Sequence, residues 1–318
     1  MVRKAKRKES GISIIISALL IAITVLAFIS FIDPGDRDQR PFGEDFEEMN
    51  PQPSSSVSIP LDRLNSPYAI LIGLNDGLVV EKNSEEVIYP ASLTKIMTAV
   101  VALENLPDLE KEIILTGAMF EGLHEANASM AGFQPGEKVR ATDLLFGAML
   151  PSGAECCRAL ATEIAGSEQD FVKIMNQKAV ELGMDNTHFT NAVGLHHDNH
   201  YTTVKDVAVL LSYALQNDTF REIFTSTRHS TPSTNIHPNG ITFYSTLFQE
   251  LDDPQITGGE LLGGKTGYTD KAGLCLASLA KVGGQEYILV TAGARGDYHT
   301  EQYNITDALM VYNSLGRN

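Results

Sequence analysis

The pattern of hydrophobic and polar positions divides the chain into a long apolar run, a polar stretch and a body of mixed periodicity. Residues 12–32 contain no charged side chain, and about 21 helical residues span roughly 30 Å, the thickness of a bilayer core. Basic residues dominate residues 1–11, which predicts a cytoplasmic tail, one transmembrane helix over 12–32 and an exported body. A cleaved signal peptide is the alternative, although its apolar region is usually shorter and no clear Ala-x-Ala site precedes Asp33.

Residues 33–60 lack the periodicity of a folded element. They contain several prolines, a serine tract and a group of carboxylates, and such a composition buries too little apolar surface to fold alone. We therefore expect a flexible linker that, as a random coil, holds residues 61–318 about 30 Å from the membrane.

Within residues 61–318 the period switches between that of strands and that of helices. Short apolar runs at 68–74 and 78–80 flank Asn75-Asp76-Gly77, which is a strong hairpin signal. Apolar residues three and four positions apart predict helices that begin at Ser92 and Thr142 and that span residues 155–164, 168–182, 203–215 and 300–315. Strand-like segments come late in the chain, at residues 263–269, 273–281 and 286–293.

The order of these elements indicates the fold class. A leading hairpin, a helical middle and a closing antiparallel meander favour an α+β fold over a doubly wound sheet. We expect the N-terminal hairpin to join the C-terminal strands in one antiparallel sheet.

Charge and cysteine content exclude several classes of protein. The formal net charge is -16, and basic residues gather at the N-terminus, so the acidic body repels nucleic acid and anionic lipid. The three cysteines, Cys156, Cys157 and Cys275, suit neither a disulfide framework nor a zinc ribbon. Their apolar surroundings indicate small buried side chains, and a bridge from Cys275 to one of the adjacent pair stays open.

Ser92 and Lys95 are the first candidates for chemistry. They lie three residues apart at the start of a predicted helix, which places their Cβ atoms about 5–6 Å apart on one face. A hydroxyl beside an amine can form a nucleophile–base pair, and a helix N-terminus favours developing negative charge. By itself Ser-x-x-Lys also occurs by chance, and a capping serine before a surface lysine is the simpler alternative.

Two further motifs follow in order, Ser152-Gly153-Ala154 and Lys265-Thr266-Gly267. This ordered set occurs in serine β-lactamases and penicillin-binding proteins. Over roughly residues 65–295 the chain resembles the D-alanyl-D-alanine carboxypeptidase family of low-molecular-weight penicillin-binding proteins. The segment from Phe171 to Leu195 carries the most specific resemblance because it is long. The resemblance implies a β-lactamase/transpeptidase-like fold, an antiparallel sheet flanked by helices with a helical subdomain.

The resemblance also implies catalytic roles. Ser92 attacks the penultimate D-Ala carbonyl of a peptidoglycan stem peptide, and Lys95 takes its proton. Ser152 relays a proton to the leaving amine. Lys95 must then be a neutral amine, and both burial and a neighbouring Lys265 cation are expected to lower its pKa.

The third motif is expected to bind substrate. Lys265 and Thr266 bind the terminal carboxylate, and Gly267 lets the strand approach the substrate closely. The backbone N–H groups of Ser92 and Tyr268 form the oxyanion hole, as the family geometry implies. A β-lactam imitates the substrate and is released slowly.

The second motif departs from the family pattern, which usually reads Ser-x-Asn. Here Ala154 replaces the asparagine, and the missing amide normally bonds the substrate backbone and helps to fix the lysine. Losing such a bond weakens transition-state stabilisation. We also expect the charge of Glu155 to push Lys95 towards its protonated form.

Other polar residues have simpler explanations than chemistry. His196, His197 and His200 cluster without a His-Glu-x-x-His pattern, so we expect a solvated loop at the cleft edge and neither a metal nor another cofactor. Two pairs are expected to be structural, on a helix surface or in a turn: Asn176 and Lys178, and Asp270 and Lys271.

The sequence therefore predicts a serine-type D-Ala-D-Ala carboxypeptidase in the bacterial cell membrane, with one span and an extracytoplasmic catalytic domain. Its predicted partners are stem peptides ending in D-Ala-D-Ala and β-lactam antibiotics. A weakly active or inactive penicillin-binding, wall-sensing protein is the alternative, motivated by Ala154. A serine β-lactamase is less favoured because no Glu-x-x-x-Asn element lies between Ser152 and Lys265.

Overall fold

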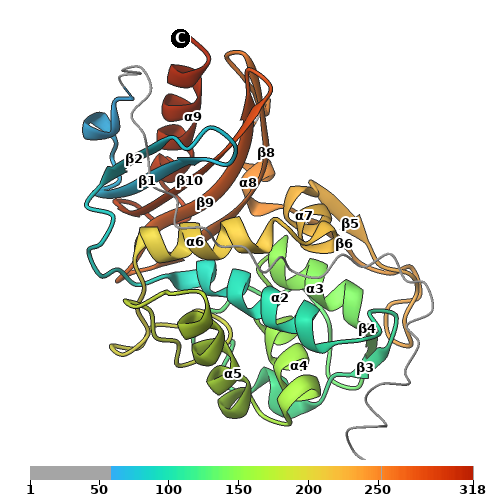
Figure 1. The fold of residues 1–318 in the computed structure, drawn as a ribbon. Helices are drawn as coiled ribbons and strands as arrows, with labels where there is room; N and C mark the ends of the chain where they lie inside the picture. The colour runs from blue at the N-terminus through green and yellow to red at the C-terminus, as the bar shows by residue number, and fades with distance from the viewer. Residues whose placement is uncertain (1–58, 252, 318) are drawn as a thin grey trace, which may run out of the picture. The chain divides into compact units, whose positions relative to one another are not determined.

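One antiparallel sheet combines strands from both ends of the described chain. The computed structural model describes residues 59–251 and 253–317. The sheet order is β2-β1-β10-β9-β8-β7, and all neighbouring strands are antiparallel. The strands are β1 (Tyr68–Gly73), β2 (Val79–Lys82), β7 (Gln255–Ile256), β8 (Gly259–Thr269), β9 (Gly273–Val282) and β10 (Gln285–Ala294). The predicted pairing of the leading hairpin with the closing meander is confirmed (Figure 1).

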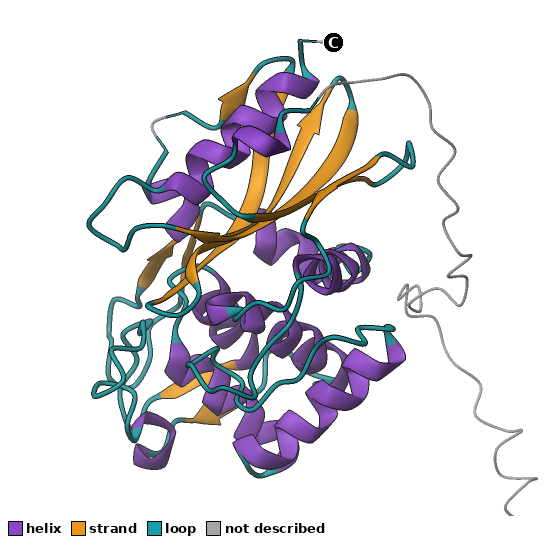
Figure 2. Cartoon of the chain, turned by 90° about the vertical axis from the view of Figure 1, so that its left-hand side faces the viewer, coloured by secondary structure: helices purple, strands orange, loops and turns teal. Residues whose placement is uncertain are grey.

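Both faces of the central strands are covered, because successive side chains of a strand point to opposite faces. Ala69 and Leu71 join an apolar cluster with Ile305 and Tyr312 of α9 (Tyr303–Leu315). The alternate residues of β1 are also buried, and α6 (Val204–Ala214) contacts β1 and β10. Sheet and helices thus form layers (Figure 2).

A group of helices lies beyond α6 in Figure 1, and α2 (Thr94–Asn105) runs through its centre. Residues 94–102 of α2 are all buried, as expected of a helix that is covered on every side. Its neighbours are α3 (Ala141–Met149), α4 (Ala154–Ala165), α5 (Glu168–Glu181), α6 and α7 (Asp218–Thr225). The first residues of α2 therefore have a rigid support.

Local signals explain most helix boundaries. The side chains of Ser167 and Thr203 cap α5 and α6 by accepting backbone N–H groups at their third helical positions. The predicted cap at Thr142 is wrong, because α3 already begins at Ala141. The remaining elements are short: η1 (Leu61–Arg63), η2 (Ala91–Leu93), η3 (Gly117–Phe120), β3 (Glu112–Ile114), β4 (Lys138–Arg140), β5 (Arg228–Ser230), β6 (Thr242–Tyr244) and α8 (Thr246–Gln249).

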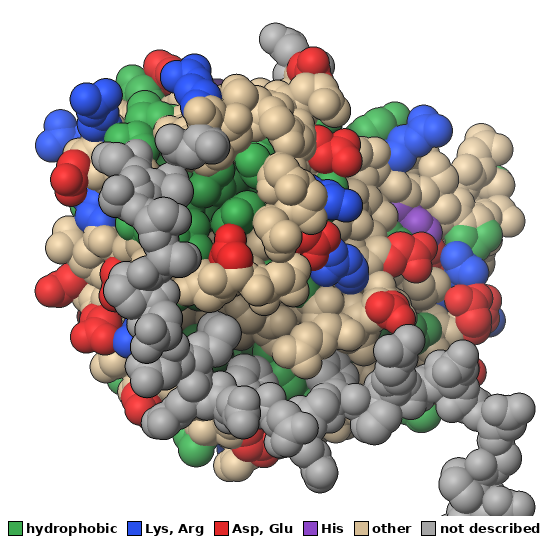
Figure 3. Space-filling view, turned by 45° about the horizontal axis from the view of Figure 1, so that its top comes forward, with side chains coloured by type: hydrophobic (Ala, Val, Ile, Leu, Met, Phe, Trp, Pro, Cys, Tyr) green, Lys and Arg blue, Asp and Glu red, His purple; other side chains and the backbone are tan. Residues whose placement is uncertain are grey.

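These observations confirm the α+β fold with an antiparallel sheet and a helical subdomain. The predicted transmembrane segment 12–32 lies outside the described residues. Among residues 59–251 and 253–317, no helix is long and apolar enough to cross a membrane. Cys156, Cys157 and Cys275 are free and buried, which confirms them as small core side chains. Acidic and basic side chains are interspersed on the face shown in Figure 3.

Candidate active site

The turn that carries Ser92 is held in an unusual backbone conformation. Ala91 has a φ of 47°, a left-handed value that is uncommon for residues other than glycine. Ser152 also has a positive φ, 66°. Such conformations persist only where the surroundings impose them, and they cluster at functional sites.

Two glycines from different layers pack closely against this turn. A Cβ on Gly194, whose φ is +91°, would lie 1.9 Å from the carbonyl oxygen of Ala91. A Cβ on Gly267 of β8 would lie 3.1 Å from the backbone nitrogen of Ser92. The absence of side chains at these two positions allows the sheet and the helical layer to converge on Ser92.

The three residues predicted to be catalytic meet at one point. The Lys95 Nζ atom donates to Ser92 Oγ at 2.9 Å and to the carbonyl of Val193 at 2.7 Å. Ser152 Oγ lies 3.0 Å from Ser92 Oγ. The structure therefore brings an amine and a second hydroxyl into hydrogen-bond range of the nucleophile candidate.

Burial favours the neutral form of Lys95, which is 2% exposed. Desolvation lowers the pKa of Lys95, while Cys157 and Glu155 act weakly in the opposite direction. The predicted effect of Glu155 is thus present but smaller than that of burial. A neutral amine at this position can accept the proton of Ser92.

Lys265 differs from the prediction in its exposure. Its side chain is fully buried, and its Nζ atom donates to the carbonyl of Thr266 at 3.0 Å. Burial and then repulsion by Lys95 hold the pKa of Lys265 well below its usual range. Repulsion by Lys95 thus helps to lower the pKa of Lys265, whereas burial alone accounts for the lowered pKa of Lys95.

Two adjoining hollows open at Ser92. The larger has a volume of about 620 Å³ and is lined by Val193, Leu195, Tyr268 and Tyr298, among others. The smaller, of about 110 Å³, has walls from all three predicted motifs and from α8: Ser92, Ser152, Thr246, Thr266, Gly267 and Tyr268. Thr246 Oγ1 lies 2.7 Å from Thr266 Oγ1. An extended peptide can thus place groups on both sides of Ser92.

Ala154 and Glu155 lie behind the segment 126–129, which lines the larger hollow. The backbone N–H of Ala154 donates to the carbonyl of Ser129 at 2.8 Å. Glu155 is fully buried, and its Oε1 atom accepts the backbone N–H groups of Ala131 and Gly132. Burial raises the pKa of Glu155. This carboxyl group therefore anchors the backbone that follows that segment.

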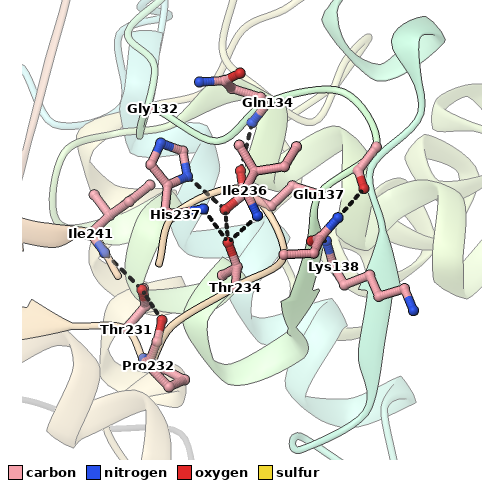
Figure 4. A network of polar contacts seen from close by, with 12 residues as sticks. Gly132, Gln134, Glu137, Lys138, Thr231, Pro232, Thr234, Ile236, His237 and Ile241 are labelled. Carbon is pink, nitrogen blue, oxygen red and sulfur yellow. Dashed lines mark hydrogen bonds and ion pairs between the residues drawn. The ribbon is translucent and has the colours of Figure 1, made fainter. Parts of the chain in front are cut away.

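A second buried carboxyl group, that of Glu137, ties residues 132–138 to the loop of the β5–β6 hairpin (Figure 4). Glu137 accepts Thr234 Oγ1 at 2.6 Å and the backbone N–H of Gln134 at 2.9 Å. It also contacts His237 Nδ1 at 2.8 Å. These bonds hold residues 132–138 against residues 231–241.

The remaining polar candidates have structural contacts. Among the described residues no group of three side chains is arranged to hold a metal ion. Asn176 exchanges two hydrogen bonds with the backbone of Phe189, and Lys178 forms an ion pair with Glu104 at 2.9 Å. Both are partly exposed on α5, and these contacts give them structural roles.

The predictions for the Asp270-Lys271 turn and for the histidine cluster are confirmed only in part. Asp270 and Lys271 do form the turn between β8 and β9, and they also line the larger hollow. His196 lines it as well, whereas His200 is buried.

Comparison with known proteins decides the family. The sequence model of the D-alanyl-D-alanine carboxypeptidase family matches residues 54–296. The chain belongs to this family. DacF of Bacillus subtilis, a D-alanyl-D-alanine carboxypeptidase, is 36% identical over 241 residues, which are 71% of this chain and 57% of that protein. DacA of Escherichia coli K12 is 32% identical over 248 residues, 73% of this chain and 57% of that protein. The chain thus spans little more than half the length of these relatives.

Solved structures share the fold. The Streptomyces K15 DD-transpeptidase superposes with a TM-score of 0.71 at 26% identity, covering 80% of this chain and 98% of that one. The D-alanyl-D-alanine carboxypeptidase of Mycobacterium tuberculosis H37Rv gives 0.70 at 27% identity, covering 83% and 95%. The transpeptidase-like fold expected from the sequence is therefore shown.

Sequence reasoning missed three contributors to the site. Val193 acts through its backbone carbonyl, which no side-chain motif reveals. Thr246 begins the short helix α8, and Tyr298 lies within the irregular segment between β10 and α9. The Asn191-to-Leu195 match to the family was the available signal for Val193.

Proposed function

We propose that the protein is a serine-type D-Ala-D-Ala carboxypeptidase that removes the terminal D-Ala from peptidoglycan stem peptides. One observation carries the proposal. Ser92 Oγ lies within 3.0 Å of both Lys95 Nζ and Ser152 Oγ, at the junction of two hollows. Family membership supports the same chemistry.

Each residue then has a defined task. Lys95, whose pKa burial lowers, removes the proton of Ser92 as the serine oxygen attacks the penultimate D-Ala carbonyl. The N–H groups of Ser92 and Tyr268 stabilise the oxyanion. Ser152 passes a proton to the leaving amine, D-Ala departs, and water hydrolyses the acyl-enzyme.

The two hollows fit the two sides of the scissile bond. We assign the larger one to the stem peptide, because it is roomy and lined by apolar and aromatic side chains. The smaller one, with the Thr246 and Thr266 hydroxyls, takes the terminal D-Ala and its carboxylate. Lys265 supports this surface from behind through its hydrogen bond to the Thr266 carbonyl, since its side chain is buried.

The location follows from the sequence of the N-terminus. We infer a single-pass protein of the bacterial cell membrane, anchored through residues 12–32, with residues 61–318 on the extracytoplasmic side. The basic residues before an uncharged run of spanning length support this orientation. Residues 33–60 then supply the reach that a substrate in the wall layer requires.

Release of D-Ala tests the function. Purified protein is incubated with a peptide ending in D-Ala-D-Ala, and free D-Ala is measured for wild type and Ser92→Ala. The proposal predicts release by wild type and none by the variant. Folded wild-type protein that releases no D-Ala and is not acylated by penicillin would instead indicate a non-catalytic protein, and rapid penicillin turnover would indicate a β-lactamase.

A further inference from the structure

The loop between α5 and α6 closes on the first turn of α2. Its Val193 carbonyl accepts a hydrogen bond from Lys95 Nζ at 2.7 Å, and its Ala192 carbonyl accepts one from Thr98 Oγ1 at 2.7 Å. Ala154 supplies only a methyl group where the usual second motif carries an amide. The orientation of Lys95 therefore depends on this loop.

Asn191 fixes the curvature of the loop. Its Oδ1 atom accepts the backbone N–H groups of Val193, Gly194 and Leu195 at 3.1, 2.7 and 3.1 Å. Its Nδ2 atom donates to the carbonyl of Leu195 at 2.9 Å. These bonds hold the Val193 peptide in one orientation.

His200 connects this loop to the nucleophile motif itself. Its Nδ1 atom lies 3.0 Å from the backbone N–H of Thr190, and only an unprotonated nitrogen can accept that bond. The ring proton is therefore on Nε2, which donates to Thr94 Oγ1 at 2.8 Å. Thr94 immediately precedes Lys95. The His200 ring is 2% exposed, so water does not replace either bond.

We propose that His200 is a positioning residue for the reaction of Ser92: the neutral ring fastens Thr94 to the loop and so keeps Lys95 between Ser92 and the Val193 carbonyl. The inference rests on the proposed function, because it assigns a purpose to the position of Lys95. His200 does not touch substrate or the reacting atoms and acts through Thr94. It lies outside the three motifs.

Substitution of Thr94 tests the connection with little change in volume. Thr94→Val removes the hydroxyl that accepts His200 Nε2–H, whereas Thr94→Ser retains it. Acylation by benzylpenicillin is followed at increasing drug concentration, which separates the first-order acylation rate from the half-saturating concentration. For Thr94→Val we expect the rate to fall about tenfold, the cost of one buried hydrogen bond, with an unchanged half-saturating concentration.

The controls separate positioning from stability. Thr94→Ser should recover most of the wild-type rate. His197→Ala removes an exposed imidazole of the same loop and should acylate like wild type. Melting temperatures identify any unfolded fraction, and rates are taken per folded molecule.

Two results would overturn the proposal. Equal acylation rates for Thr94→Val and wild type would show that the His200 contact does not position Lys95. A rise in the half-saturating concentration at an unchanged rate would show that the contact affects binding alone. If wild type itself is not acylated, the proposed function fails, and this is distinguishable because it precedes any comparison of variants.

Discussion

The two walls that meet at Ser92 are built in different ways. The helical wall consists of the Asn191–Leu195 turn and Lys95, and the sheet wall is the segment Lys265–Tyr268 of β8. Each wall brings one buried lysine and one glycine to the site. The lysine of the helical wall contacts Ser92, while that of the sheet wall donates to its own neighbour's carbonyl.

The difference separates two tasks. Hydrogen bonds from Asn191 and Thr98 fix the helical wall, and they set the direction of the base. The sheet wall offers hydroxyl and backbone groups to the smaller hollow, with a register that β9 defines. We propose that the helical wall governs acylation chemistry and that the sheet wall governs recognition of the substrate terminus.

The strongest test of this division compares the two lysines. Lys95→Met removes the base, and we expect acylation to slow by about 10³-fold, within the range for general-base catalysis. Lys265→Met keeps the base and removes the hydrogen bond that supports the Thr266 carbonyl, so we expect a loss of about 10- to 100-fold, mostly in binding. Saturation kinetics with penicillin measure both. A larger rate loss in Lys265→Met would reverse the assigned tasks.

The glycines provide the next test. Gly194→Ala places a Cβ against the Ala91 carbonyl at a positive φ, so we expect a loss of about 3 kcal/mol or more in unfolding free energy. Gly267→Ala creates only a tight contact at 3.1 Å, for which about 1–2 kcal/mol is expected. Gly117→Ala, with open space around the added atom, is the control. Urea unfolding measures all three, and equal losses would contradict the asymmetry.

His200, which lies in the same α5–α6 loop as the turn of the helical wall, makes the stability of the protein depend on pH. Burial lowers the pKa of His200 to about 3 from its model-peptide value of 6.5. The folded state therefore disfavours the imidazolium, and stability is lost as the pH falls from 6.5 towards 3. Between pH 7 and 4.5 this contribution is about 2–3 kcal/mol.

The variant His200→Asn isolates that contribution. We expect its unfolding free energy at pH 7 to be lower than that of wild type, because Thr94 Oγ1 loses the hydrogen bond from His200 Nε2–H. Between pH 7 and 4.5 the unfolding free energy of the variant should decrease by about 2–3 kcal/mol less than that of wild type. Parallel pH dependences in the two proteins would show that His200 is not the titrating group.

The smallest effect is expected from Ala154→Asn. The site is fully buried, so the larger side chain destabilises the fold by about 1–3 kcal/mol. Because Val193 already orients Lys95, we expect the acylation rate of folded protein to change by less than about threefold. An increase above tenfold in the penicillin assay would mean that the missing amide limits wild type.

The sequence predicted the long elements because their signals are local. Thr203 caps α6, and the Asn75-Asp76-Gly77 turn precedes β2. The three-residue strands β3 to β6 were missed because such short pairs depend on tertiary contacts, such as those of Glu137. The existence of α7 was missed as well.

The residues that form the site could be identified from the sequence, but the burial and the hydrogen-bond partners of their side chains could not. The motifs identified Ser92, Lys95 and Ser152, and the structure places them together. Burial of Lys265, the backbone acceptor at Val193 and the partner of His200 depend on how distant segments pack. No pattern along the chain encodes these contacts directly.

The most direct test of the account is the site of acylation. Wild-type protein is treated with benzylpenicillin, its intact mass is measured, and a proteolytic digest locates the adduct. We predict one added penicilloyl group per chain, on Ser92, with no adduct in Ser92→Ala or in Lys95→Met over the same time. An adduct on another residue, or equal labelling of Ser92→Ala, would contradict the central claim that Ser92 is the nucleophile.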